Sequence, residues 1–299
     1  MLAESTLTRV APVAGIAITH ELMDGIELES NATADWRGTN ESSHPLVIRH
    51  EVGDVSTRRM RRVLDVPPWC TFHVDERGEP SSRFHAVFGE VDRLLSCEAP
   101  GSRYVVRYGQ APHAPVVALQ SELTAFAFAL AARGSGLIAH SCAFILPEGQ
   151  AVLCPGMSGA GKTTLARLLR DNAPAIDLLT DDRAIVTLED RLTLWGSPWP
   201  GSARVSGTGS ALLSAVMFIR HGHAVALRRV PPGEAFRRMV NSLSMPLWEP
   251  ARCGRALEIV DVLVTRPVVV EATYPATIDA ARRLCDELTS VSAEAHVAA

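Results

Sequence analysis

Residues 156–164 read Gly-Met-Ser-Gly-Ala-Gly-Lys-Thr-Thr, between a predicted strand at 150–154 and a predicted helix at 163–170. The stretch fits the pattern G-x-x-x-x-G-K-[ST], in which backbone N–H groups of a glycine-rich loop cradle phosphates. Lys162 is the only lysine of the chain, because every other residue in the combined count of 29 lysines and arginines is arginine. An ammonium group is a compact point charge that suits phosphate. The stretch therefore predicts a polyphosphate-binding site.

The physical roles within this loop follow from charge and backbone freedom. Glycine tolerates the positive φ angles that turn successive N–H groups inward, and the following helix presents the partial positive charge of its N-terminus. We expect Lys162 to reach the β- and γ-phosphates and the Thr163 hydroxyl to bind Mg²⁺. The expected ATP-binding residues are Gly156, Ser158, Gly159, Ala160, Gly161, Lys162, Thr163 and Thr164.

Two adjacent carboxylates follow about twenty residues later, at the end of a predicted strand, 178–182. One of Asp181 and Asp182 can associate with Mg²⁺, with Asp182 preferred, and the other can accept the proton of an attacking hydroxyl. Both are therefore candidate catalytic residues, together with Lys162. The alternative is that the pair merely caps a turn.

His140 lies on the strand predicted just before the loop strand, so that a hairpin could bring it beside the phosphates. It is a candidate catalytic residue, although a lone histidine among apolar residues can also be a hydrogen-bonded core residue. His221 and His223 are interpreted as surface histidines, since no third metal ligand is evident.

The pattern of predicted elements changes near residue 112. Short alternating runs such as 46–50, 71–74 and 103–108 predict a β-rich N-terminal region, 1–112, in which 31–43 is a loop. Residues 113–299 are expected to form an α/β domain that contains the phosphate loop. Its further predicted elements are helices at 119–132, 233–244 and 277–288 and strands at 137–146, 184–188, 192–195, 215–219, 224–227, 260–264 and 267–271.

Composition limits the class of protein. The 299 residues carry a net charge of -4, which gives no overall basic surface for nucleic acid. The six cysteines form no C-x-x-C pair, and scattered cysteines fit a reducing cytosol. Charged residues interrupt the most apolar stretch, 116–146, and no signal peptide is evident, so we expect a cytoplasmic protein without a membrane partner. Homo-oligomerisation is left open.

Three segments together resemble the HPr kinase/phosphorylase family. They are 136–141 (Gly-Leu-Ile-Ala-His-Ser), 156–165 around the loop, and 178–183 (Leu-Leu-Thr-Asp-Asp-Arg). Residues 196–201 (Gly-Ser-Pro-Trp-Pro-Gly) are also similar to a segment of stand-alone HPr kinase-like proteins. The resemblance covers approximately 119–288.

The resemblance implies a phosphate-loop kinase core of the HPr kinase/phosphoenolpyruvate carboxykinase type, with ATP and Mg²⁺ as cofactors and a serine hydroxyl as acceptor. Lys162 and Thr163 match the family's loop residues, His140 matches its upstream histidine, and Asp181 and Asp182 match its acidic pair. The glycine- and arginine-rich segment of the bifunctional enzymes has no counterpart here, which argues against phosphorylase activity and against HPr as acceptor.

Stand-alone HPr kinase-like proteins of this length occur with biosynthetic systems for ribosomally made peptides, including lasso peptides, where they phosphorylate a precursor serine. By analogy, the expected function is ATP- and Mg²⁺-dependent phosphorylation of a serine or threonine in a peptide or protein, with such a precursor as the preferred acceptor. The alternatives are a small-molecule hydroxyl phosphotransferase and a non-catalytic ATP-binding regulatory module.

Overall fold

In the computed structural model, which describes residues 6–23, 25–29, 45–68, 70–85 and 91–297, the chain divides into two compact units. Unit 1 comprises residues 1–134 and 246–254, and unit 2 comprises 135–245 and 255–299. The expected boundary at 112/113 differs from this division. The predicted helix at 119–132 belongs to unit 1, because its buried face packs within the β-rich region, where Phe128 meets Tyr104 and Trp248. The predicted loop at 31–43 lies outside the described residues.

Unit 1 is built on a mixed sheet of eight described strands in the order β1-β2-β4-β9-β8-β7-β6-β5. The strands are β1 (Thr6–Val13), β2 (Ile16–Leu22), β4 (Leu46–Val52), β5 (Arg61–Val66), β6 (Cys70–Val74), β7 (Pro80–Phe84), β8 (Arg93–Ala99) and β9 (Arg103–Tyr108). β2, β4 and β9 are parallel neighbours, and the remaining pairs are antiparallel. A short parallel pair joins β3 (Leu28–Glu29) to β10 (Val116–Val117). Helix α1 (Leu119–Arg133) packs near β4.

A chain of buried polar groups runs through the core of unit 1. His20 bonds through Nε2 to Glu122 Oε2 at 3.0 Å and through Nδ1 to His50 Nε2 at 3.0 Å. His50 Nδ1 is 2.8 Å from the Tyr108 hydroxyl. Buried polar groups are costly unless they are hydrogen-bonded. This hydrogen-bond network therefore fixes the position of α1 against β2, β4 and β9.

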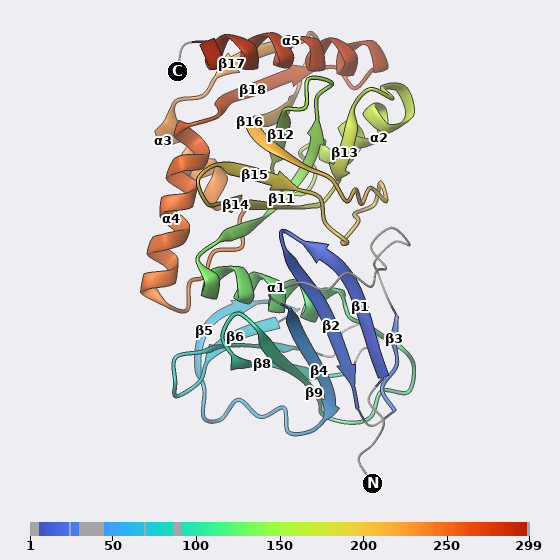
Figure 1. The fold of residues 1–299 in the computed structure, drawn as a ribbon, viewed down its shortest axis with the longest axis vertical. Helices are drawn as coiled ribbons and strands as arrows, with labels where there is room; N and C mark the ends of the chain where they lie inside the picture. Colours follow the sequence, from blue (N-terminus) through green and yellow to red (C-terminus); the bar gives the residue numbers. More distant parts are fainter. Residues whose placement is uncertain (1–5, 24, 30–44, 69, 86–90, 298–299) are drawn as a thin grey trace. The chain divides into compact units, whose positions relative to one another are not determined.

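Unit 2 is an α/β structure around a second mixed sheet (Figure 1). Its strands are β11 (Gly136–Ile145), β12 (Ala151–Pro155), β13 (Asp177–Thr180), β14 (Arg183–Leu188), β15 (Leu192–Trp195), β16 (Ser210–His221), β17 (Ala226–Arg229) and β18 (Val268–Tyr274). Its helices are α2 (Lys162–Asn172), α3 (Pro232–Val240), α4 (Pro250–Thr265), whose first residues are grouped with unit 1, and α5 (Ile278–Val297).

Strand pairing closes part of this sheet into a ring. β12, β11, β14, β15 and β16 follow one another, and β16 pairs with β12 in parallel, while β18 and β17 continue from β16. Because β12 and β16 are parallel, the carboxyl ends of both strands lie at the same edge of the sheet. The loop after β12 and the residues that end β16 therefore meet.

Alternating side chains of β16 and β18 bury two separate cores. Val216 and Phe218 face the core that contains α3 and α4, whereas Ala215, Met217 and Ile219 face the core that contains α2 and α5. This period of two is the one expected for a strand that is covered on both faces. Figure 1 shows α5 lying along β18.

The predicted strand at 260–264 is wrong, because these residues belong to helix α4. The buried residues of α4 are Ala256, Ile259, Val260, Leu263 and Val264, which recur at the helical spacing i, i+3, i+4, i+7 and i+8. The helical period is not visible in residues 260–264 alone, because a short apolar run can belong to a strand or to a helix. Among the described residues, no helix has both the length and the apolarity that crossing a bilayer requires.

Candidate functional site

The loop between β12 and α2 contains two glycines with left-handed backbone conformations. Gly159 and Gly161 have φ angles of 85° and 100°, which L side chains rarely adopt. A Cβ on Gly161 would also lie 3.5 Å from His221 Cε1 and 3.4 Å from Ile219 Cγ2. The N-terminus of α2 has no side-chain cap and no acidic residue in its first turn, so its N–H groups face the loop uncompensated.

Lys162 lies inside this loop and is 5% exposed. Its Nζ donates to the carbonyl oxygens of Gly156 at 2.7 Å and Met157 at 2.9 Å. Burial lowers the pKa of Lys162 from its ordinary value, the carboxylate of Asp182 opposes that shift, and Arg183 adds to it. The lysine thus links its ammonium group to two carbonyl oxygens at the start of the loop and lines the cavity described below.

His140 and Asp182 form an ion pair beside the loop. β11 pairs with β12 and with β14, which sets His140 across from Arg183, next to Asp182. His140 Nε2 is 3.1 Å from Asp182 Oδ1, and Arg183 Nη1 is 2.8 Å from the same oxygen. The main chain links this pair to the loop, since Gly156 N donates to His140 O at 3.3 Å.

The carboxyl of Asp182 is held in its ionised form. Burial raises its pKa, but the hydrogen bond from His140 and the positive charges of Arg183, His140 and Lys162 outweigh burial, so the pKa lies below the ordinary 3.8. The side chains of His140 and Asp182 are each 32% exposed, so the pair remains open to a substrate.

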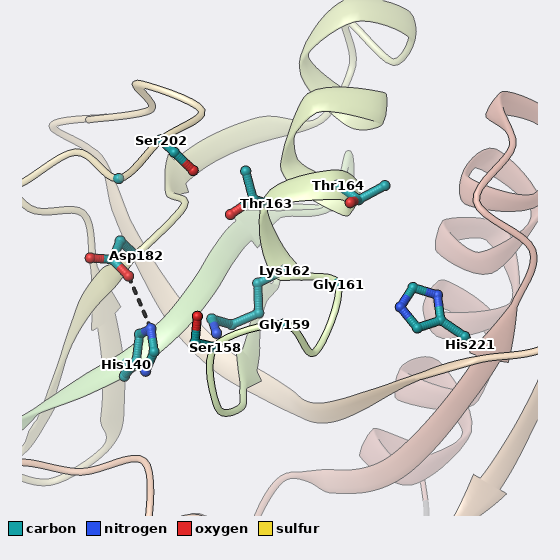
Figure 2. Close-up of a pocket in the computed structure, with 11 residues that line it drawn as sticks. His140, Ser158, Gly159, Gly161, Lys162, Thr163, Thr164, Asp182, Ser202 and His221 are labelled. Atoms are coloured by element: carbon teal, nitrogen blue, oxygen red, sulfur yellow. Dashed lines mark ion pairs between the residues drawn. The ribbon is translucent and has the colours of Figure 1, made fainter.

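These groups line one cavity of about 400 Å³ (Figure 2). Its lining residues are His140, Ser158, Gly159, Gly161, Lys162, Thr163, Thr164, Asp182, Gly201, Ser202 and His221. Figure 2 shows His140 and Asp182 on one side of the loop and His221 on the other. The predicted residues Gly156 and Ala160 belong to the loop without lining the cavity, and a Cβ on Gly156 would lie 3.0 Å from Ala160 Cβ.

Asp181 does not line the cavity, and its side chain has a different environment from that of Asp182. It is 1% exposed and accepts three backbone N–H groups, from Gly201 at 2.8 Å, Ala203 at 2.6 Å and Val205 at 3.1 Å. The strand predicted at 178–182 ends earlier, because β13 ends at Thr180 and the two aspartates form the bend that leads into β14. Asp181 fixes segment 201–205, whereas Asp182 faces the cavity.

Ser202 was not predicted as a site residue, and His221, interpreted from the sequence as a surface histidine, is exposed and also lines this cavity. His221 ends β16, and only the parallel pairing of β16 with β12 brings it to the loop. Ser202 is brought in by the contacts of Asp181 with segment 201–205. Residues 196–201 were identified from the sequence as a motif. Their distance in sequence from Asp181 and Asp182 does not indicate that the segment which follows them binds the Asp181 carboxylate.

The donor set fits a polyphosphate with a divalent cation. Uncapped N–H groups, one ammonium group and several hydroxyls suit phosphate oxygens, and a carboxylate with the Thr163 hydroxyl suits Mg²⁺. No group of three or more His, Cys, Asp or Glu among the described residues could hold a metal by itself. A magnesium ion here would rely on phosphate oxygens and water for its remaining ligands, as Mg²⁺ commonly does.

Comparison with protein-family models finds no match, and a search of curated proteins finds none either.

Proposed function

We propose that this protein is an ATP- and Mg²⁺-dependent kinase that phosphorylates a serine or threonine hydroxyl of a peptide or protein. The observation that carries the proposal is the shared cavity, in which the loop groups Lys162 and Thr163 face the same space as the His140–Asp182 pair. Phosphoryl transfer requires this combination of a phosphate cradle and a proton acceptor.

The division of labour follows from the contacts. Lys162 and the N–H groups at the start of α2 bind and orient the phosphate chain of ATP. Asp182 accepts the proton of the acceptor hydroxyl, because it is ionised and open to the cavity. His140 and Arg183 both bond Oδ1 of Asp182 and so orient the carboxylate.

With Asp182 serving as the proton acceptor, Thr163 would hold Mg²⁺ together with phosphate oxygens and water, and the ion when bound would neutralise charge on the phosphate oxygens. The protein's own contribution is then mainly positioning. It fixes an acceptor oxygen, a proton acceptor and a phosphate chain in one cavity, which converts a bimolecular reaction into one between bound partners.

The preferred acceptor is a ribosomally made precursor peptide such as a lasso peptide precursor. The support for this choice is the resemblance of 136–141, 156–165 and 178–183 to HPr kinase-like proteins, together with the similarity of 196–201 to stand-alone members. The side of the cavity that carries Asp182 also carries Gly201, which has no side chain and leaves room beside the carboxylate for an acceptor serine.

Mass spectrometry of candidate precursor peptides, incubated with the protein, ATP and Mg²⁺, tests the proposal. Wild type is expected to add one phosphoryl group to a serine or threonine, and Lys162→Ala is expected to add none. Asp177→Asn is the matched control, because Asp177 is exposed and lies outside the cavity. Transfer that survives both Lys162→Ala and Asp182→Asn would exclude this site as the source of the activity.

A further inference from the structure

We propose that the protein phosphorylates itself at Ser202, within the same cavity. The inference rests on the proposed kinase function and adds a modification site to it. Ser202 is the one hydroxyl among the described lining residues that comes from neither the phosphate loop nor the start of α2. Figure 2 shows it on the same side of the cavity as Asp182 and facing Thr163.

The Ser202 hydroxyl is free to react. The residue is exposed, and in the described part of the chain its hydroxyl makes no hydrogen bond. Ser206, four residues on, contrasts with it, because the Ser206 hydroxyl donates to the carbonyl of Ser197 at 2.7 Å. An exposed hydroxyl can bond to water instead and is free to rotate toward a bound phosphate.

The backbone around Ser202 is held in place from two sides. Asp181 accepts the N–H groups of Gly201, Ala203 and Val205, as described above. From α2, Arg167 donates to the carbonyl of Ser202 at 3.2 Å and Arg170 to the carbonyl of Ala203 at 2.7 Å. These bonds maintain a left-handed φ of 56° at Arg204, which is strained for a residue with a side chain.

The same geometry brings Ser202 close to the proton acceptor. A Cβ built on Gly201 would lie 2.7 Å from Asp182 Cβ and 2.6 Å from Asp181 Oδ2, so only glycine fits between the two aspartates and this segment. Ser202 is the next residue. Its side chain lines the same cavity as Asp182 and faces Thr163 (Figure 2).

The reaction is balanced without a further reagent. The Ser202 oxygen forms a bond to the γ-phosphorus of ATP, the bond from that phosphorus to the β,γ-bridging oxygen breaks, and ADP leaves. The hydroxyl proton goes to Asp182 and then to solvent. The product carries about two negative charges near Asp182, so a phosphorylated chain should accept an external serine less readily.

Trypsin makes the test specific. Cleavage after Arg191 and Arg204 releases residues 192–204, which contain Ser202, whereas the loop serine Ser158 is released in residues 134–162. The full-length protein is incubated with ATP and Mg²⁺ without acceptor, and the phosphorylated residue is located by fragmentation. We expect phosphate on Ser202 in wild type, none in Asp182→Asn, and a rate independent of protein concentration, as a reaction within one molecule requires.

Two variants distinguish phosphorylation of Ser202 from the proposed kinase activity on which it depends. Ser202→Ala should lose the label while still phosphorylating an external peptide, and Ser202→Thr should retain it. Ser210→Ala, an exposed serine outside the cavity, is the matched control. Phosphate on Ser158, or an unlabelled 192–204 peptide from a protein that phosphorylates external peptides, overturns the inference and leaves the kinase function standing. Absence of transfer to every hydroxyl overturns both.

Discussion

Each of the two units contains a histidine–carboxylate pair of nearly the same length, and the surroundings of the two pairs differ. His20 and Glu122 lie 3.0 Å apart in unit 1, with side chains 2% and 11% exposed. His140 and Asp182 lie 3.1 Å apart in unit 2, and each is 32% exposed. The first pair continues into His50 and Tyr108, whereas the second faces a cavity beside Lys162. The two pairs have similar geometry, so we infer their different roles from exposure: a substrate can reach His140 and Asp182, whereas His20 and Glu122 are buried.

Of the substitutions that probe this comparison, Asp182→Asn should have the largest effect. The amide oxygen can still accept from His140, so the fold should persist, but the proton acceptor is lost. The rate of transfer to a peptide should fall by about 10²–10⁴-fold, the range that general base catalysis contributes. Initial rates at saturating ATP measure it, with urea unfolding as the control for folding. A rate within tenfold of wild type would mean that Asp182 is not the proton acceptor.

Asp181→Asn should mainly lower the stability of the fold. An amide nitrogen cannot accept an N–H, so the substitution sets a donor against one of the three N–H groups that Asp181 now binds. We expect the free energy of unfolding to fall by about 1–3 kcal/mol. Asp177→Asn, an exposed change at the start of the preceding strand β13, should stay within about 0.5 kcal/mol of wild type in the same urea titration. Equal effects of the two would show that the contacts of Asp181 contribute little.

Glu122→Gln replaces the carboxylate of the buried His20–Glu122 pair by an amide of the same shape. The side-chain amide can still accept from His20, so only the charge-assisted part of the bond is lost. A decrease of about 1 kcal/mol in the free energy of unfolding is expected. The apparent Kd for ATP should not change, which isothermal titration can measure. A weaker affinity at unchanged stability would contradict a purely structural role for this pair.

The smallest expected effect is a change in how stability depends on pH. Burial, then the charges of His20 and Arg93, hold the pKa of His50 well below 6.5. Below pH 6.5 the unfolded chain therefore binds a proton that the folded chain does not, so acidification destabilises the fold. The pKa of Asp182 is also lowered, but its stabilising contribution is lost only as pH falls below 3.8.

Urea unfolding between pH 7.5 and 5 should thus show a loss of stability that is smaller in His50→Gln. Asp182→Asn should leave that slope unaltered over the same range, because Asp182 stays ionised there. An identical slope in wild type and His50→Gln would show that His50 does not carry the dependence.

The elements around the loop could be predicted from sequence because they are local. Strand, glycine loop and helix follow one another within 151–172, and the hairpin of β11 and β12 brings His140 beside the loop. The separate environments of Asp181 and Asp182 could not be predicted, because they depend on where segment 201–205 returns. The place of His221 beside the loop could not be predicted for a related reason, since only the parallel pairing of β16 with β12, which are far apart in sequence, brings it there.

The domain boundary illustrates the same limit. The change in the pattern of predicted elements near residue 112 suggested a division there, but α1 packs against strands that precede it, with Phe128 next to Phe72 and Tyr104. Hydrophobic periodicity predicted helix α1, but the sequence of a helix does not indicate which sheet it packs against. The strand predicted at 260–264 failed because five residues are too few to distinguish a period of two from one of 3.6.

The central claim is that one cavity holds both the phosphate loop and the proton acceptor. The most direct test is the rate of phosphate transfer from ATP to a precursor peptide for wild type, Lys162→Ala and Asp182→Asn, each shown by urea unfolding to be folded. The account predicts transfer by wild type, none by Lys162→Ala, and retained ATP binding with little transfer by Asp182→Asn. Transfer by Asp182→Asn at the wild-type rate would contradict it.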